Sequence, residues 1–196
     1  KMRGLVETLR AEGHTVERLD LGGGLGVPYF NQPEPPSPAD YAAMVSRVIG
    51  DLHVQLAFEP GRMIAANAGV LLSQVIHRHE RPEGRKFLVL DAAMNDLLRP
   101  AMYDAFHDIR PVAATNAEPE PFDVVGPVCE TGDTFTRDRV MPSLNSGDLV
   151  AFMSAGAYGA AMASEYNSRP LVPEVLVHGD KFAVIRRRPT YEEMLS

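Results

Sequence analysis

The stretch "RLDLGGGLGVPYF", residues 18–30, places four glycines directly after a short apolar run. Glycine loses more conformational freedom on folding than any other residue, so a glycine run is expected where the backbone needs what only glycine allows. One such need is a φ above zero. Another is the close approach of a ligand to successive backbone N–H groups, which together form a concave site for a phosphate. A plain tight turn after a strand is the alternative interpretation.

The glycine run does not match the common nucleotide-binding motifs. A P-loop ends in Gly-Lys-Ser/Thr, whereas Leu25, Gly26 and Val27 stand there instead. The dinucleotide fingerprint needs a third glycine three positions after the second, and Val27 occupies that position. If a phosphate binds here, we therefore expect it to belong to a cofactor other than ATP or NAD.

The segments around the glycine run alternate between helix and strand patterns. Helices are predicted over 2–12 and 37–52, the second with Ser37 as N-cap and Pro38 at its first position, and strands over 16–21 and 54–58. The proline-rich stretch 31–38 between them is predicted to be a loop. This order predicts that residues 1–66 are the end of a TIM-type (β/α) barrel, in which active sites lie at the C-terminal ends of the strands.

After residue 66 the pattern changes to short apolar or β-branched runs separated by Pro, Gly and Asp clusters. The runs are "VLLSQVIHRHE", "KFLVLDAA", "VVGPVCE", "DLVAFMSA" and "KFAVIRRR". Such runs with turn signals between them indicate strands and hairpins. Residues 67–196 are therefore predicted to form an antiparallel β-sandwich or barrel domain.

Bulk composition narrows the classes of function. The 196 residues carry a net charge of −7, which argues against nucleic acid as a partner, and no apolar run is long enough to span a membrane. The single cysteine, Cys129, excludes an internal disulfide and predicts a cytoplasmic protein. His77 and His79 share a strand face, but they have no ligand-type neighbours at the usual spacing, so we expect no metal site.

Two motifs supply candidates for binding an anion. "EPGR", residues 59–62, ends the second predicted strand, so Glu59 and Arg62 can face one space across a Pro-Gly turn. In "LLRPAMYDAFH", Arg99 and Tyr103 are spaced i, i+4 and can hold a carboxylate from one helix face. The alternatives are a structural turn with a surface ion pair and a surface Arg–Tyr stack.

Two more motifs supply a proton donor and a ligand contact. "CETGD" sets the thiol of Cys129 beside the carboxylate of Glu130 in a polar turn, and a neutral thiol can donate a proton. "AGAYG" sets Tyr158 among small residues that leave space for a ligand against its ring. A buried inert thiol and a close-packed helix are the alternatives.

Taken in order, "LDLGGGLG", "EPGR", "LLRPAMYDAFH", "CETGD" and "AGAYG" resemble the diaminopimelate decarboxylases, pyridoxal-phosphate enzymes of the alanine-racemase-like fold type. The resemblance covers most of the chain. It implies decarboxylation of meso-2,6-diaminopimelate to L-lysine, the last step of lysine biosynthesis. Ornithine and arginine decarboxylases share the two glycine-containing motifs, and a related enzyme of that type is an alternative.

The resemblance also implies roles for individual residues. Gly22, Gly23, Gly24, Gly61 and Arg62 would bind the cofactor phosphate, and Glu59 would pair with the pyridine nitrogen. Arg62, Arg99 and Tyr103 would hold the substrate, Glu130 its remote ammonium, and Tyr158 both phosphate and substrate. Cys129 would be the catalytic proton donor. Cys129 and Glu130 would serve the other subunit's site, which implies a homodimer.

One departure from the family pattern concerns the lysine that forms the Schiff base with the cofactor. The chain has only Lys1, Lys86 and Lys181, and none stands where the family has this nucleophile. We therefore expect a fragment that begins partway through the protein and is inactive alone. A catalytically inactive, decarboxylase-like binding or regulatory subunit is the alternative.

Overall fold

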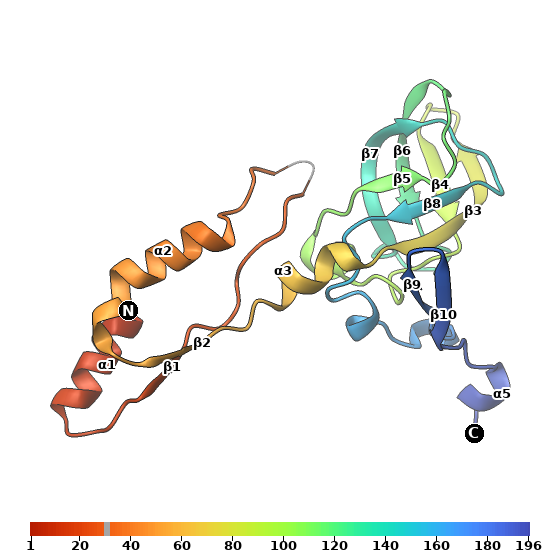
Figure 1. Cartoon of the computed structure of the whole chain (residues 1–196). Helices are drawn as coiled ribbons and strands as arrows, with labels where there is room; N and C mark the ends of the chain where they lie inside the picture. The colour runs from red at the N-terminus through yellow and green to blue at the C-terminus, as the bar shows by residue number, and fades with distance from the viewer. Residues whose placement is uncertain (30–31) are drawn as a thin grey trace. The chain divides into compact units, whose positions relative to one another are not determined.

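The computed structural model describes residues 1–29 and 32–196, which divide into two compact units, Lys1–Asn67 and Ala68–Ser196 (Figure 1). The division falls one residue after the boundary predicted from the sequence. The proline-rich loop predicted over 31–38 begins outside the described residues, and its described part, from residue 32, holds no helix or strand before Pro38.

The first unit is built around one parallel strand pair. Strands β1 (Arg18–Asp20) and β2 (Gln55–Ala57) pair in parallel, with Leu19 opposite Leu56. Helix α2 (Pro38–Ile49) and the short η1 (Gly50–Leu52) connect the two strands, so the three elements form a βαβ unit. The remaining elements are α1 (Met2–Ala11), α3 (Gly61–Ala65) and η2 (Ala66–Ala68), the last at the boundary between the units.

Helix α2 begins where the sequence predicts it. The Ser37 side chain accepts a hydrogen bond from the Asp40 backbone N–H, and the Asp40 carboxylate accepts one from the Ser37 N–H. This reciprocal capping box, with Pro38 at the first helical position, fixes the start of the helix. Because β1 and β2 run in parallel, their C-terminal ends lie at the same edge of their sheet.

The core of the first unit lies between α1, α2 and the two strands. Its buried side chains are Val6, Leu19, Val45, Ile49 and Leu52. The apolar side chains of α2 are only partly covered, because Met44 and Val48 are exposed. Two short strands cover only a narrow stripe of a helix, so the outer apolar residues of α2 stay uncovered within the described chain.

The second unit contains a six-stranded sheet with strand order β5-β8-β3-β4-β6-β7. Its strands are β3 (Leu71–Glu80), β4 (Lys86–Leu90), β5 (Ile109–Pro111), β6 (Pro119–Val125), β7 (Thr134–Pro142) and β8 (Leu149–Phe152). Four of the five predicted strand runs coincide with β3, β4, β8 and β10 (Lys181–Arg186), whereas "VVGPVCE" enters β6 only with its first two residues, and no run was predicted over β7. The prediction of an antiparallel domain needs correction, because β4 pairs with β6 in parallel. The long connection through α4 (Arg99–Tyr103) and β5 lets the chain re-enter the sheet in the same direction.

The second unit has its own apolar core. Its largest fully buried apolar side chains are Phe122, Phe152, Leu88, Leu90, Leu97, Val75, Val124 and Val150. The rings of Phe135 and Phe152 lie 4.6 Å apart between centroids. This apolar core is what holds the loops at the strand ends in place.

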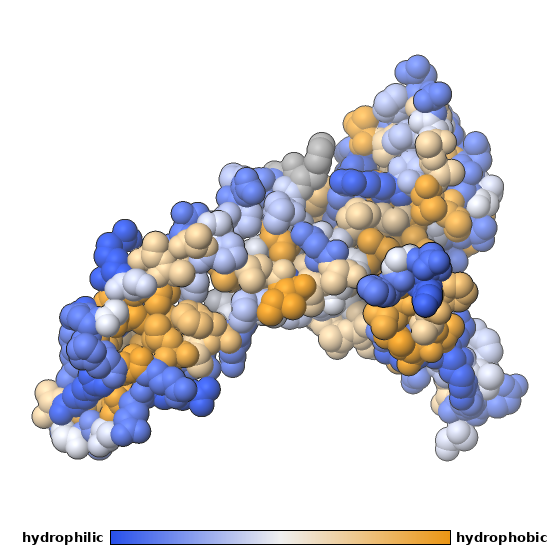
Figure 2. Space-filling view, viewed as in Figure 1, coloured by the Kyte–Doolittle hydropathy of each residue, from blue (hydrophilic) through white to orange (hydrophobic). Residues whose placement is uncertain are grey.

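A separate hairpin follows the main sheet. Strands β9 (Glu174–His178) and β10 (Lys181–Arg186) pair only with each other, and α5 (Tyr191–Met194) follows them, while η3 (Ala160–Met162) and η4 (Tyr166–Ser168) precede them. Figure 2 shows an apolar area where Figure 1 labels this hairpin, and its exposed members include Val177, Phe182 and Val184. Among the described residues, no helix has the length and apolar character needed to cross a membrane.

Candidate functional site

The glycine run and the Pro-Gly turn contact each other at the C-terminal ends of β1 and β2. The backbone N–H of Glu59 donates to the carbonyl oxygen of Gly22 at 2.8 Å. A Cβ atom added to Gly23 would lie 2.5 Å from the carbonyl oxygen of Glu59, a distance that no side chain tolerates. Glycine is therefore required at position 23 by the close approach of the two predicted loops.

The backbone of the glycine run leaves some N–H groups available to a ligand. Gly22 and Gly24 have φ values of +67° and +94°, which favour glycine. The Gly22 N–H donates to Asp20 Oδ1 at 2.8 Å, and the Gly61 N–H donates to the Glu59 carbonyl at 2.8 Å. Within the part of the chain that the structure describes, the N–H groups of Gly23 and Gly24 have no hydrogen-bond partner.

The second unit brings Arg99 and Tyr158 together. Arg99, at the start of α4, is 9% exposed, and its guanidinium carbon lies 5.6 Å from the centre of the Tyr158 ring. Tyr103, at the end of the same helix, is 62% exposed. The predicted i, i+4 pair therefore lies on one short helix, but its two members differ in environment, with only Arg99 buried against the sheet domain.

His107 orients the Arg99 guanidinium. Arg99 Nη1 lies 3.4 Å from His107 Nε2, and His107 Nδ1 lies 3.0 Å from the carbonyl oxygen of Met153. Since a guanidinium only donates, Nε2 accepts and the Nδ1–H donates to Met153. Burial lowers the pKa of His107, and the adjacent Arg99 charge acts in the same direction. A neutral imidazole is therefore the form that suits this contact.

The turn that carries Tyr158 is tightly wound. Tyr158 has φ +61° and Ser154 has φ +56°, both in the left-handed region that costs a residue with a side chain roughly 1–2 kcal/mol. A Cβ on Gly159 would lie 2.2 Å from the carbonyl oxygen of Ala155. The "AGAYG" segment is therefore a strained turn and not the close-packed helix of the alternative interpretation, and strain of this kind gathers at functional sites.

The "CETGD" turn is fixed by a buried carboxylate. Asp133 is buried, and its two oxygens accept the backbone N–H groups of Val128 at 2.8 Å and Met94 at 2.7 Å. Burial raises the pKa of Asp133, and the two backbone hydrogen bonds act against that rise. The exposed thiol of Cys129 and the exposed carboxylate of Glu130 project from the turn that Asp133 holds.

Glu130 is oriented by a tyrosine far away in the sequence. The Tyr166 hydroxyl donates to Glu130 Oε2 at 2.5 Å, and this hydrogen bond raises the pKa of Tyr166. Both side chains line a cavity of about 320 Å³, together with Met94, Asn95, Leu98 and Ser164. A carboxylate on the wall of such a cavity can hold a cationic group such as an ammonium.

This chain is similar to several known proteins that share one name. It is 54% identical over 192 residues to the diaminopimelate decarboxylase of Zymomonas mobilis, covering 97% of this chain and 45% of that protein. It is 46% identical over 194 residues to the enzyme of that name from Pseudomonas aeruginosa, covering 99% and 46%. A solved structure of diaminopimelate decarboxylase from Helicobacter pylori, complexed with L-lysine, matches with a TM-score of 0.88 and 42% identity, over 97% of this chain and 47% of that one.

The family model for the C-terminal sheet domain of pyridoxal-dependent decarboxylases matches residues 28–156. The chain belongs to this family. It spans about half the length of the curated relatives it matches.

The first unit fits the phosphate of the pyridoxal cofactor that this family name implies. The fit rests on the positive φ values of Gly22 and Gly24, and on the N–H groups of Gly23 and Gly24, which have no hydrogen-bond partner among the described residues. Glu59 lies on the adjoining turn, and Arg62 is the second residue of α3, which begins at Gly61. Lys86, by contrast, is ion-paired with Glu120 in the sheet.

Three residues that orient candidate site residues or their turns were not assigned a role from the sequence. They are His107, Asp133 and Tyr166. Asp133 and His107 stood inside quoted motifs, but their contacts reach residues 39 and 46 positions away. Tyr166 is 36 positions from Glu130, so no local spacing links the two.

Proposed function

We propose that this chain provides the phosphate-binding and substrate-recognition parts of a diaminopimelate decarboxylase, which converts meso-2,6-diaminopimelate to L-lysine. The observation that carries the proposal is the 54% identity to the Zymomonas mobilis enzyme of that name over 192 residues. In this proposal the first unit is the end of a TIM-type barrel, which its βαβ unit supports.

The first unit would bind the cofactor by its phosphate and its ring. Gly22, Gly23, Gly24 and Gly61 would surround the phosphate, with the free N–H groups of Gly23 and Gly24 as its donors. Arg62 would add a charged hydrogen bond to the same phosphate. Glu59 would accept from the protonated pyridine nitrogen. When bound, pyridoxal phosphate supplies the electron sink that decarboxylation at an α-carbon requires.

The second unit would hold the substrate at both ends. Arg99, with Tyr103 and Tyr158, would bind the carboxylate of the substrate, a task for which the buried and oriented guanidinium of Arg99 is suited. Arg62 would also contact the substrate. Glu130 would accept from the ammonium at the remote end.

Cys129 would supply a proton during the reaction. Its thiol is exposed on the turn that Asp133 fixes, so the Sγ–H can reach a bound molecule. In the proposal, Sγ delivers its proton to the substrate α-carbon after carbon dioxide has left. The chain would act as a cytoplasmic homodimer in which Cys129 and Glu130 serve the partner's site.

A chimera tests this function. The N-terminal half of the Zymomonas mobilis enzyme is joined to this chain at the aligned position, and carbon dioxide release is measured with meso-diaminopimelate, ornithine and arginine. We expect activity with diaminopimelate alone, and about 10²–10⁴-fold slower turnover for the same chimera with Cys129→Ala.

Two results would change the proposal. Faster release from ornithine or arginine would assign the chain to a related decarboxylase. A folded chimera that binds the cofactor but releases no carbon dioxide from any of the three would favour the inactive binding or regulatory subunit.

A further inference from the structure

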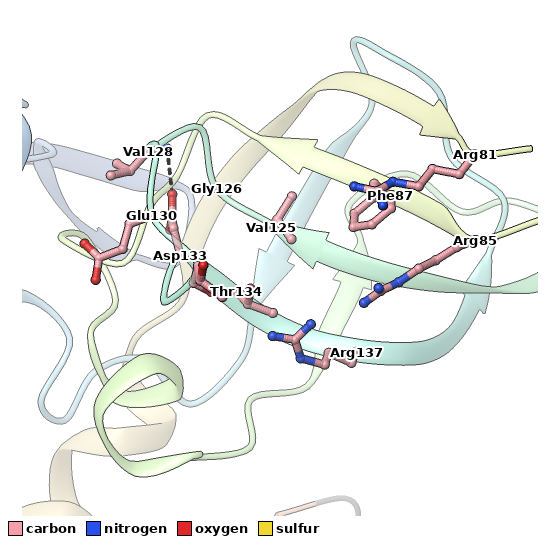
Figure 3. A pocket seen from close by; sticks show the side chains of 11 residues that line it. Arg81, Arg85, Phe87, Val125, Gly126, Val128, Glu130, Asp133, Thr134 and Arg137 are labelled. Atoms are coloured by element: carbon pink, nitrogen blue, oxygen red, sulfur yellow. Dashed lines mark hydrogen bonds between the residues drawn. The ribbon is translucent and has the colours of Figure 1, made fainter. Parts of the chain in front are cut away.

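A second cavity, of about 340 Å³, lies on the sheet domain between the β3–β4 turn and the "CETGD" turn. Figure 3 shows arginine side chains from two directions around it, Arg81 and Arg85 from the β3–β4 side and Arg137 from β7. Its apolar wall is formed by Phe87, Val125 and Val128. None of the residues assigned a role in cofactor binding lines this cavity.

The three guanidinium groups differ in how their charge is compensated. Arg85 is ion-paired with the buried carboxylate of Asp123, which therefore neutralises it. Arg81 has a long contact of 3.8 Å to the exposed Glu83, and its guanidinium carbon lies 5.1 Å from the centre of the uncharged Phe87 ring. Arg137 has no ion pair or hydrogen bond within the part of the chain that the structure describes.

The two carboxylates on the cavity wall do not compensate Arg137. Asp133 is occupied by the backbone N–H groups of Val128 and Met94. Glu130 accepts from Tyr166, and in Figure 3 its side chain points away from the arginines. An uncompensated cationic site therefore persists on a chain whose net charge is −7.

We propose that this cavity is a binding site for a small organic anion, held through a carboxylate or phosphate group by Arg137 and Arg81. Guanidinium groups bind both anions with paired N–H donors. The cavity volume is at the low end of the range for small-molecule sites, which favours a metabolite over a peptide or nucleic acid. The apolar wall at Phe87, Val125 and Val128 would cover the body of the ligand.

A ligand in this cavity would also contact the "CETGD" turn. Val128, Glu130 and Thr131 line the cavity and flank Cys129 on either side. A ligand that contacts these residues should restrict access to the Cys129 thiol. Because Cys129 is the only cysteine of the chain, its labelling rate reports on occupancy without interference and without any need for catalysis.

The test titrates the full 196-residue chain with two probes, benzoate and inorganic phosphate, and follows binding by calorimetry and by the rate of Cys129 alkylation. We expect at least one probe to bind and to slow alkylation. Arg137→Gln should weaken that probe about tenfold, and Arg81→Gln should weaken it less. The control Arg110→Gln removes an exposed arginine that pairs with Asp108 on the same unit, and it should bind like the unaltered chain.

The two probes separate the two anion classes. Binding of benzoate indicates a carboxylate ligand with an apolar body, and binding of phosphate alone indicates a phosphorylated ligand. The proposal is wrong if neither probe binds, if Arg137→Gln binds as tightly as the control, or if Arg137→Gln changes only self-association in sedimentation. These readouts do not depend on decarboxylation, so they stand or fail separately from the proposed function.

Discussion

Tyr166 keeps Glu130 in one orientation through a single hydrogen bond of 2.5 Å. Tyr166→Phe removes the donor and keeps the ring, so Glu130 loses its fixed position but not its charge. In the chimera we expect a KM for diaminopimelate about fivefold higher with kcat nearly unchanged, the size of one ordinary hydrogen bond. Steady-state kinetics measure both constants.

The matched control is Tyr191→Phe, which removes an exposed hydroxyl from α5. It should leave both constants as they are. A fall of kcat in Tyr166→Phe as large as the rise of KM would contradict this role of Tyr166. A Glu130 carboxylate that has lost its orientation should impair binding of the substrate ammonium and not the later steps.

His107 should make the sheet domain sensitive to mild acid. Burial lowers its pKa in the folded protein below the ordinary value of 6.5, so the unfolded chain takes up the proton first as pH falls. The free energy of unfolding should therefore decrease from about pH 6.5 down to the folded pKa, and the part due to His107 should be constant below it. Urea unfolding followed by circular dichroism at several pH values measures this.

His107→Gln should abolish this contribution to the pH dependence of the free energy of unfolding. It should also lower stability at pH 7.5, because the buried contacts to Arg99 and Met153 change. His178→Gln, at an exposed position at the end of β9, serves as the control. If the free energy of unfolding changes equally between pH 6.5 and 5 in the unaltered chain and in both variants, His107 does not titrate in the way that its burial requires.

The sequence indicated the candidate site residues, but it did not indicate the residues that position them. Gly23, Glu59, Arg99, Cys129 and Glu130 stood out because their residue types carry chemistry at the ends of predicted elements. Their partners did not, because a contact such as Tyr166 to Glu130 depends on how the chain folds back and leaves no periodic pattern. The difference between buried Arg99 and exposed Tyr103 could likewise not be derived from their i, i+4 spacing.

At the level of elements, the contact between the glycine run and the Pro-Gly turn predicts a sharp response to one methyl group. In Gly23→Ala the added Cβ would lie 2.5 Å from the Glu59 carbonyl, so one of the two loops must move. We expect the first unit to lose about 1–3 kcal/mol of stability and the chimera to bind pyridoxal phosphate less tightly. Urea unfolding of the chain and a cofactor titration of the chimera measure the two effects.

Gly50→Ala is the control in the same unit, since Gly50 has φ −61° and no heavy atom within 4 Å of an added Cβ. It should keep both stability and cofactor affinity. Unchanged cofactor affinity in Gly23→Ala, together with a clear loss of stability, would leave position 23 structural and remove it from the proposed phosphate site.

Many of the elements followed from local signals, but strands β5, β7 and β9 and the pairing of the strands did not. Ser37, Asp40 and Pro38 define the start of α2 because capping is decided within four residues. The parallel pairing of β4 with β6 depends on the course of the chain over the 28 residues between Leu90 and Pro119. No pattern inside either strand records that course, so the expected all-antiparallel domain was wrong at this point.

At the level of the whole molecule, the proposed homodimer makes a prediction that kinetics on mixtures can check. In the proposal, each active site combines the cofactor-binding residues of one subunit with Cys129 and Glu130 of the other. Two inactive versions of the chimera test this arrangement. One carries Cys129→Ala, and the other lacks the Schiff-base lysine in its N-terminal half.

Neither homodimer should work, because each of its two sites has one defect. In a mixed dimer both defects fall on the same site and the other site is intact, so activity should return to about half of the unaltered dimer per mixed dimer. Mixing under conditions of subunit exchange, with the mixed species quantified by a tag on one subunit, measures this. If mixed dimers form and activity stays at the level of the two parents, Cys129 acts in its own subunit, and the arrangement in which "CETGD" completes the partner's site is wrong.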